Sequence, residues 1–351
     1  MTHAPQSHGS IPYAELRQLQ IDPSTIMDFS ATVNPFPLPQ SIRDLFTGDG
    51  IAAYPDPESC EAGAALAAHH RLPYEWMAIT AGLTETLFIL PLLYEHAVEF
   101  APTYGDYAAA YIRHRRSMVS VSFPSTEPEF YAVIDSLRKK AFQLLIICNP
   151  NNPTGQYLPA HRIQELCEVF SFAAICVDES YQEMGENCDS AISLTTRFRN
   201  LLILKSLTKP FGIGGLRAGY AVSSGGVLKR IRQYLMPWGV SSLAQRIIPA
   251  LVANYALFQH QWKLVHAQKR DMMQQLSRQG FVVASGECPF FLVKTKDAEQ
   301  KRRMLLSEHH IAVRSCASFG MPQWIRIMPG RPEQNLQLLD ILARTGHSEA
   351  T

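Results

Sequence analysis

Three observations predict an α/β fold with a mostly parallel sheet and a smaller α+β domain. From about residue 74 to residue 223, short apolar runs alternate with segments of helical period, which is typical of a parallel sheet wrapped by helices. Polar side chains and glycines follow several of these runs, at the strand ends where α/β sheets bind ligands. With 351 residues and 46% hydrophobic content, the chain is long enough to bury the cores of two domains.

We expect three parts along the chain. Residues 1–45 form an N-terminal arm that joins the small domain, because the proline-rich segment 34–39 favours an extended backbone. Residues 46–245 form the large domain and residues 246–351 the small one. A long helical pattern opens the small domain and ends near Gly280. The strands expected after it cover residues 281–283 and 290–293.

The segment 79–87 combines a glycine with the start of a helix. Glycine lets the backbone approach an anion, and a helix that begins near Thr84 points free N–H groups toward it. Gly82, Leu83 and Thr84 are therefore candidates for binding an anionic group. An ordinary helix N-cap accounts for the same three residues.

Two further apolar runs are followed by polar residues of a specific kind. Residues 143–148 lead into a turn rich in proline and asparagine that includes Asn152. Residues 173–177 lead into Asp178 and, three residues later, Tyr181. A carboxylate followed by a phenol suits a protonated heteroaromatic ring that carries a hydroxyl group. Taken singly, each residue is equally well explained as part of a turn or a strand end.

The most specific feature is Lys209, which follows the apolar run 201–204. An amine at the end of a buried strand can lose its proton by desolvation and condense with an aldehyde. Ser206, Thr208 and Arg217 supply hydrogen-bond donors and positive charge for a nearby phosphate. A lysine Schiff base beside a phosphate site predicts pyridoxal 5'-phosphate as the cofactor. The alternative is a surface lysine after a strand.

This cofactor gives the earlier candidates definite roles. Asp178 would hold the ring nitrogen protonated, which makes the ring an electron sink. Asn152 and Tyr181 would hydrogen-bond the phenolic oxygen and so tune the Schiff base.

Four motifs together resemble the fold-type I superfamily of pyridoxal phosphate-dependent aminotransferases. They are Asn-Pro-Asn-Asn-Pro-Thr-Gly at 149–155, Asp-Glu-Ser-Tyr at 178–181, Ser-Leu-Thr-Lys at 206–209 and Gly-Leu-Arg at 215–217. The resemblance implies that superfamily's fold, with Lys209 as the catalytic residue that binds the cofactor and moves protons. It also implies phosphate contacts from Ser206 and Arg217 and ring stacking by Tyr104, for which core packing is the competing explanation.

The chain departs from this pattern at two places. Ala81 stands where these relatives commonly have asparagine, which loosens the phosphate-loop assignment. Residues 211–215 are unusually rich in glycine, which indicates a more flexible segment after Lys209.

Other motifs resemble the threonine-phosphate decarboxylases of cobamide synthesis, which are close relatives of histidinol-phosphate aminotransferases. The motifs are His-Gly-Ser at 8–10, Asp-Phe-Ser-Ala at 28–31 with Asn34-Pro35, Met-Pro-Trp at 236–238 and Arg-Ser-Cys-Ala-Ser at 314–318. The resemblance implies decarboxylation of L-threonine O-3-phosphate to (R)-1-aminopropan-2-ol O-phosphate. The substrate-binding residues that we expect are His8, Gly9, Asn34, Arg314 and Arg326.

The two arginines carry the physical part of this expectation. Arg314 follows the apolar stretch 311–313 and Arg326 lies within 324–327, so both are expected on strands of the small domain. Guanidinium groups there suit a substrate with a carboxylate and a phosphate, whereas structural ion pairs are the alternative. An aminotransferase, such as one for histidinol phosphate, and a serine-phosphate decarboxylase remain the competing functions.

Composition and charge bound the partners. A net charge of +1 with interspersed charges disfavours a nucleic-acid or membrane surface. The family resemblance implies a small phosphorylated amino acid as the partner. The seven cysteines have no metal-binding spacing, and no segment resembles a signal peptide, so we expect free thiols and a cytoplasmic protein. The family resemblance implies a homodimer in which Tyr54 reaches the neighbouring subunit's cofactor phosphate; an ordinary turn at 54–57 explains the same residue.

Overall fold

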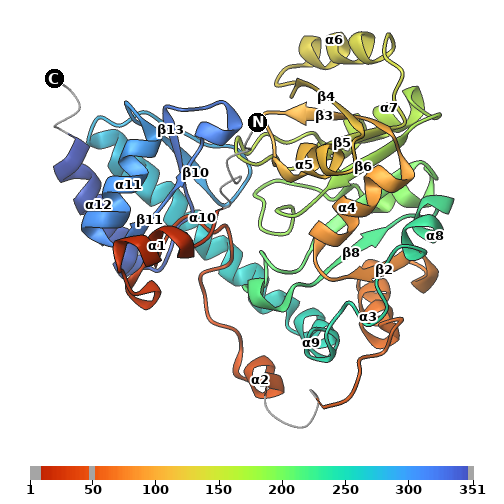
Figure 1. The fold of residues 1–351 in the computed structure, drawn as a ribbon, viewed down its shortest axis with the longest axis horizontal. Helices are drawn as coiled ribbons and strands as arrows, with labels where there is room; N and C mark the ends of the chain where they lie inside the picture. Colours follow the sequence, from red (N-terminus) through yellow and green to blue (C-terminus); the bar gives the residue numbers. More distant parts are fainter. Residues whose placement is uncertain (1–8, 47–51, 347–351) are drawn as a thin grey trace.

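Two sheets dominate the computed structural model, which describes residues 9–46 and 52–346 (Figure 1). The larger sheet has seven strands in the order β2-β8-β7-β6-β5-β3-β4. β8 runs antiparallel to its neighbours β2 and β7, and the other pairs are parallel. The strands are β2 (Met77–Thr80), β3 (His96–Ala101), β4 (Ser117–Ser122), β5 (Leu144–Cys148), β6 (Ala174–Asp178), β7 (Leu201–Ser206) and β8 (Gly219–Val222). The predicted α/β fold with a mostly parallel sheet is therefore confirmed.

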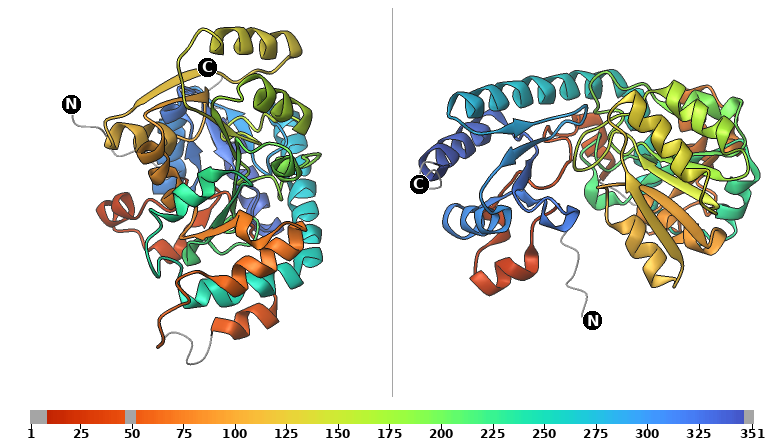
Figure 2. Two further views of the ribbon diagram at one scale, coloured as in Figure 1. Left: turned by 90° about the vertical axis from the view of Figure 1, so that its right-hand side faces the viewer. Right: turned by 90° about the horizontal axis from the view of Figure 1, so that it is seen from above.

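Helices cover both faces of this sheet (Figure 2). They are α3 (Cys60–His70), α4 (Leu83–Leu93), α5 (Asp106–Arg113), α6 (Glu127–Leu137), α7 (Ala160–Val169), α8 (Gly226–Arg232) and α9 (Ser242–Ala253). Leu144 and Ile146 pack with α4, α5 and α8, whereas Leu145 and Ile147 pack with the layer formed by α3, α6, α7 and α9. Because both faces are covered, every residue of β5 and β6 is buried, and all of them except Asp178 are apolar.

The register of the central strands brings the predicted motifs to one edge. Cys148 of β5 pairs with Asp178 of β6, and Asp178 pairs with Leu204 of β7. The segments that leave these three strands therefore start side by side. This is the edge at which ligands bind in parallel sheets.

The smaller sheet has four antiparallel strands in the order β12-β13-β10-β9. Its strands are β9 (Val283–Ala284), β10 (Phe291–Lys294), β12 (Arg314–Ser315) and β13 (Trp324–Ile327). The helices beside it are α10 (Tyr255–Arg278), α11 (Ala298–His309) and α12 (Pro332–Gly346). The helical pattern expected to run toward Gly280 is two helices, α9 and α10, which meet at Asn254.

The N-terminal arm lies against the smaller sheet. Its strand β1 (Met27–Asp28) pairs in parallel with β11 (Ile311–Ala312). Helix α1 (Tyr13–Leu19) packs on the same region, and Arg302 of α11 binds Glu15 through two hydrogen bonds of 2.9 and 3.0 Å. The remaining short elements are α2 (Gln40–Arg43) and the 3-10 helices Pro23–Thr25, Asp44–Phe46, Tyr74–Trp76, Ala191–Thr196, Gly214–Leu216 and Ala317–Phe319.

Helix α10 belongs to both halves of the molecule, as its length in Figure 1 illustrates. Its first part contributes Phe258 and Trp262 to the core beside the large sheet, and its second part contributes Met272 and Leu276 to the core of the small one. The domain limits at residues 45 and 245 remain predictions. None of the helices in the described part of the chain is both long and apolar enough to span a bilayer.

Candidate active site

A cavity of about 390 Å³ lies at the carboxyl ends of β5, β6 and β7. The large sheet, the smaller sheet and the N-terminal arm all contribute to its wall. The predicted residues that line it are Gly9, Leu83, Thr84, Tyr104, Asn152, Asp178, Tyr181, Ser206, Lys209, Arg217, Arg314 and Arg326. Gly82, Asn34 and Tyr54 are not part of its wall, and His8 lies outside the described residues.

Lys209 projects into this cavity from the segment after β7. Its Nζ donates to Ser206 Oγ at 3.4 Å and lies 5.4 Å from the centre of the Tyr181 ring. Within the described chain no carboxylate forms an ion pair with it. Burial lowers the pKa of Lys209, the charges of Arg217 and Arg326 lower it further, and Asp178 and Cys148 oppose the shift. The neutral amine that attacks an aldehyde is thus favoured.

Asp178 lies at the other end of the cavity, buried and held by two donors. Its Oδ2 accepts from the Tyr107 hydroxyl at 2.7 Å, and its Oδ1 accepts from the Ser180 amide at 2.9 Å. Tyr107 was not predicted, although it lies in the first turn of α5, three residues after the predicted Tyr104. The rings of Tyr104 and Tyr107 meet edge to face with centres 5.6 Å apart.

Asn152 and Tyr181 lie between these two ends. Asn152 Oδ1 accepts from Arg326 Nη1. The Tyr181 hydroxyl is 2.8 Å from Oγ1 of Thr32, a buried residue of the arm that also lines the cavity. Thr32 is a second residue that sequence reasoning missed, because it lies between the two recognised motifs, residues 28–31 and Asn34-Pro35, and belongs to neither.

The phosphate end combines a helix start with an arginine. Gly82 has a φ of +78° and precedes α4, whose first residues are Leu83 and Thr84. A Cβ at Gly82 would lie 3.0 Å from Arg217 Nη2, so glycine both allows the backbone conformation and leaves room for the guanidinium. Arg217 is exposed and, within the described chain, forms no ion pair. Free helix N–H groups and an uncompensated guanidinium form an anion site.

Ser206 and Thr208 lie beside Lys209 at this end. Their hydroxyl oxygens are 2.7 Å apart, and both residues line the cavity. Each hydroxyl can therefore donate to an anion held near Arg217.

The two arginines of the smaller sheet face each other across a strand pair. Arg314 of β12 is paired in register with Arg326 of β13. Arg326 is 3% exposed, donates to Ser30 O at 3.0 Å and stacks on the Phe290 ring at 4.9 Å. Its Nε has no hydrogen-bond partner, and no carboxylate in the described chain pairs with it. A buried positive charge of this kind is costly unless an anion joins it.

Arg314 is held by Ser318, which accepts from Nη2 at 2.7 Å, and lies 5.1 Å from the centre of the Phe319 ring. Burial and the neighbouring charge of Arg326 lower the pKa of Arg314 to about 10. Both effects are relieved when an anion binds between the two guanidinium groups.

Asn34 and Gly9 were both predicted to bind the substrate, but only Gly9 lines the cavity. Asn34 Nδ2 donates to Gln261 Oε1 at 2.7 Å and to Pro210 O at 3.2 Å, and its Oδ1 accepts from the Phe36 amide at 3.1 Å. These bonds occupy its side chain outside the cavity, so the expected substrate contact is corrected to a structural one. Gly9 does line the cavity, and a Cβ there would lie 2.6 Å from Arg326 Nη2.

Tyr54 does not line the cavity of its own chain. It is 85% exposed, and its ring centre lies 5.4 Å from that of Trp238.

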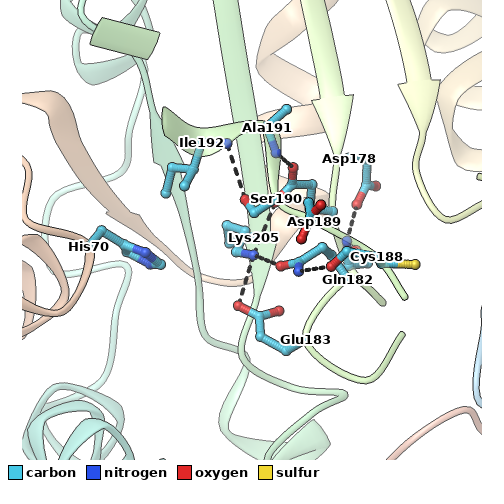
Figure 3. Close-up of polar contacts among 12 residues, drawn as sticks. His70, Asp178, Gln182, Glu183, Cys188, Asp189, Ser190, Ala191, Ile192 and Lys205 are labelled. Atoms are coloured by element: carbon cyan, nitrogen blue, oxygen red, sulfur yellow. Dashed lines mark hydrogen bonds and ion pairs between the residues drawn. The ribbon is translucent and has the colours of Figure 1, made fainter. Parts of the chain in front are cut away.

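Behind the site, a closed ionic cluster joins β6 to β7 (Figure 3). Lys205 is 1% exposed, and its Nζ contacts Glu179 Oε2 at 3.1 Å, Glu183 Oε1 at 2.9 Å and Gln182 Oε1 at 2.6 Å. Glu179 also accepts from Ser190 Oγ at 2.5 Å. Burial alone would lower the pKa of Lys205, but the two glutamates outweigh it and raise the pKa above its ordinary value. Sequence reasoning did not find this cluster.

The residues present fit pyridoxal 5'-phosphate. The cavity has the volume of a small-molecule site. It contains an amine that pairs with no carboxylate of residues 9–46 or 52–346, an anion site at a helix start and a buried carboxylate at the opposite end. The cofactor's aldehyde, phosphate and ring nitrogen need these three groups.

Fold and site together define a pyridoxal phosphate-dependent enzyme. The chain belongs to the aminotransferase class I and II family, whose model matches residues 24–342. The predicted cofactor and superfamily are thereby confirmed.

Relatives of more than one activity resemble the chain. It is 28% identical to the threonine-phosphate decarboxylase of Salmonella typhimurium, over 96% of this chain and 95% of that protein. It is also 28% identical to histidinol-phosphate aminotransferase 1 of Cupriavidus pinatubonensis, over 95% and 92% of the two chains. The histidinol-phosphate aminotransferase structure from Sinorhizobium meliloti in complex with pyridoxal-5'-phosphate has the same fold, with a TM-score of 0.85 and 21% identity over 99% of this chain and 98% of that one.

Proposed function

We propose that this enzyme decarboxylates an O-phospho amino acid, converting L-threonine O-3-phosphate to (R)-1-aminopropan-2-ol O-phosphate for cobamide biosynthesis. The observation that carries the proposal is the buried pair of Arg314 and Arg326, of which Arg326 has no carboxylate partner in the described chain. Two guanidinium groups beside Lys209 suit a small substrate with two anionic groups. The similarity to a threonine-phosphate decarboxylase along nearly the whole chain supports the same reading.

The cofactor would be held by groups already described. Arg217, Ser206 and the start of α4 would bind its phosphate, Asp178 would keep its ring nitrogen protonated, and Tyr104 would contact its ring. When bound, pyridoxal 5'-phosphate supplies an electron sink that stabilises negative charge at the substrate Cα.

The arginines decide which bond at Cα breaks. If they bind the substrate phosphate, no guanidinium would hold the carboxylate in place. Carbon dioxide would then leave, its bonding electron pair would stay on Cα, and Lys209 Nζ would return a proton there. An arginine that instead bound the carboxylate would retain it and leave the Cα hydrogen to be removed, which would lead to transamination.

We also propose that the enzyme acts as a homodimer. Tyr54, Met236 and Trp238 are exposed apolar residues, and the rings of Tyr54 and Trp238 are in contact. The Met236 backbone amide donates to Glu85 in the first turn of α4, which connects this surface to the proposed phosphate site. A second copy that covers this surface would complete the site with its own Tyr54. Sedimentation of the wild type and of Trp238→Glu tests this: we expect a dimer for the first and dissociation for the second, and a wild-type monomer would contradict it.

A cytoplasmic location is the third part of the proposal. All seven cysteines are free, and five of them are buried. Free thiols are the normal state in a reducing compartment.

Product identification with O-phosphothreonine tests the reaction. Release of carbon dioxide without a keto acid supports decarboxylation, whereas keto-acid formation with an amino acceptor would show an aminotransferase. Histidinol phosphate and O-phosphoserine serve as competing substrates. The missing methyl group of O-phosphoserine is worth only about 1–3 kcal/mol of pocket contact, so we expect a preference of roughly 10- to 200-fold.

A further inference from the structure

The N-terminal arm contacts the reaction centre at every second residue from Ser30 to Asn34. The Ser30 carbonyl accepts from Arg326 Nη2 at 3.0 Å. The Thr32 hydroxyl meets the Tyr181 hydroxyl at 2.8 Å. The backbone amide of Asn34 donates to the backbone carbonyl of Lys209 at 2.8 Å. Of these three contacts, only that of Thr32 joins a side chain of the arm to a side chain that faces the cofactor.

The hydrogen-bond inventory determines the direction of this contact. Each hydroxyl carries one proton, and in the described chain neither Thr32 Oγ1 nor the Tyr181 hydroxyl has another partner. If Tyr181 donated to Thr32, the Thr32 proton would lack an acceptor and the Tyr181 proton would be turned away from the cofactor. If Thr32 donates to Tyr181, the Tyr181 proton points into the cavity, toward the phenolic oxygen of the cofactor. Only the second arrangement gives both protons an acceptor.

We propose that Thr32 is a positioning residue that donates its hydroxyl proton to Tyr181 and thereby directs the Tyr181 proton at the cofactor's phenolic oxygen. The inference rests on the proposed contact between Tyr181 and that oxygen, and it holds for decarboxylation and for transamination alike. A hydroxyl that accepts one hydrogen bond becomes a better donor of the next, so Thr32 strengthens the bond to the phenolic oxygen as well as orienting it.

The environment of Tyr181 keeps its proton in place for donation. Both Thr32 and Tyr181 are buried, and burial raises the pKa of Tyr181. Other titratable or charged groups also surround this hydroxyl or its ring. They are Arg326 of β13, Lys209 after β7, Tyr104 before α5, Cys148 of β5 and Cys288 before β10.

The test is the pH titration of the holoenzyme's visible absorption band before any substrate is added. A donor at the phenolic oxygen lowers the affinity of the neighbouring imine nitrogen for its proton, so losing that donor raises the midpoint. We expect Thr32→Val to move the midpoint upward by roughly half a pH unit to one unit, the equivalent of about one net hydrogen bond. Thr32→Ser, which keeps the hydroxyl, should retain the wild-type midpoint.

Two further variants separate this role from a structural one. Thr195→Val removes another buried hydroxyl bond, from Oγ1 to Ile192 O at 2.6 Å, and should leave the midpoint unchanged. In a Tyr181→Phe background, Thr32→Val should cause no further shift, because its effect passes through the tyrosine. If valine impairs folding, Thr32→Ala makes the same measurement with a smaller side chain.

An unchanged midpoint in Thr32→Val would overturn the inference, and a fall would show that Tyr181 donates to Thr32 instead. An equal shift in the Tyr181→Phe background would also overturn it, as would a protein that takes up no cofactor. A holoenzyme that shows the expected shifts but releases no carbon dioxide from O-phosphothreonine contradicts only the proposed reaction.

Discussion

Lys205 lies in β7 and Lys209 follows four residues later, just after that strand. Lys205 is buried and Lys209 is partly buried, and their pKa values shift in opposite directions. Lys205 contacts two glutamates behind the sheet, and they raise its pKa. Lys209 faces the cavity with a hydroxyl at 3.4 Å and no carboxylate ion pair in the described chain, and burial lowers its pKa. Burial alone therefore does not decide whether a lysine is a structural cation or a reactive amine. The decisive difference is the presence of counter-charges.

The arginines repeat this contrast. Arg302 is bound by Glu15 and Glu299 and lies outside the cavity, whereas Arg326 is buried within it without a carboxylate from the described chain. Lys205 and Arg302 form ion pairs with carboxylates outside the cavity. Lys209, Arg217 and Arg326 line the cavity and form no carboxylate ion pair in the described chain.

The largest effect is expected from removing the reactive amine. Lys209→Ala should lower kcat by roughly 10⁴-fold, because both the covalent link and the proton donor are lost. Borohydride reduction followed by mass spectrometry should find a cofactor adduct on Lys209 in the wild type and none in the variant. Lys229→Ala, at an exposed position of α8, is the matched control and should keep full activity. An adduct at another lysine would contradict the assignment.

Removing the compensated lysine should affect stability instead. Lys205→Met leaves two buried carboxylates unpaired, so we expect the free energy of unfolding in urea to fall by about 3–5 kcal/mol. Combining it with Glu179→Gln and Glu183→Gln should recover part of that loss. Arg344→Met breaks an exposed pair with Asp340 and should cost less than about 1 kcal/mol. A loss in Lys205→Met no larger than that of the control would contradict a stabilising role for the cluster.

The arginines allow the same comparison on substrate binding. Arg326→Gln should lower kcat/KM for O-phosphothreonine by roughly 10- to 150-fold, the value of a charge-assisted hydrogen bond of about 1.5–3 kcal/mol. Arg302→Gln removes a compensated guanidinium from the smaller domain and should leave kcat/KM unchanged. Equal losses in the two variants would show that Arg326 acts only through the fold.

The fold and most of the cavity wall were predictable because the informative residues follow buried strands. Asn152, Asp178 and Lys209 each come after an apolar run, and parallel strands bring their carboxyl ends to one edge. The Lys205 cluster was not predictable in the same way. Its partners are neighbours of Asp178 and Tyr181 in sequence, and they meet Lys205 only because Asp178 pairs with Leu204 across the sheet.

The N-terminal arm gives a second example of side-chain contacts that the sequence did not predict. Asn34 belongs to a recognised motif, whereas Thr32, two positions earlier, does not, so the sequence pattern favoured Asn34 as the residue that faces the cavity. In the structure the Asn34 side chain donates to Gln261 and Pro210, and the Thr32 hydroxyl contacts the Tyr181 hydroxyl. Side-chain direction in an irregular segment depends on contacts with distant parts of the chain, so a local pattern does not determine it.

The smallest effect should appear in the pH dependence of the free energy of unfolding. The charged form of Lys209 is expected to lower this free energy, and the charged form of Lys205 is expected to raise it. In the chain freed of cofactor, the lowered pKa of Lys209 means that folding disfavours its charged form; this cost is full below the folded pKa and vanishes as the pH rises through the unfolded value. The raised pKa of Lys205 means that its stabilisation is full below the unfolded value and is lost only as the pH rises through the folded one. Urea unfolding between about pH 8 and about pH 10 should therefore show the advantage of Lys209→Met over the wild type shrinking. Over the same range the deficit of Lys205→Met should stay constant, and parallel behaviour of the two variants would refute the contrast between a compensated and an uncompensated buried amine.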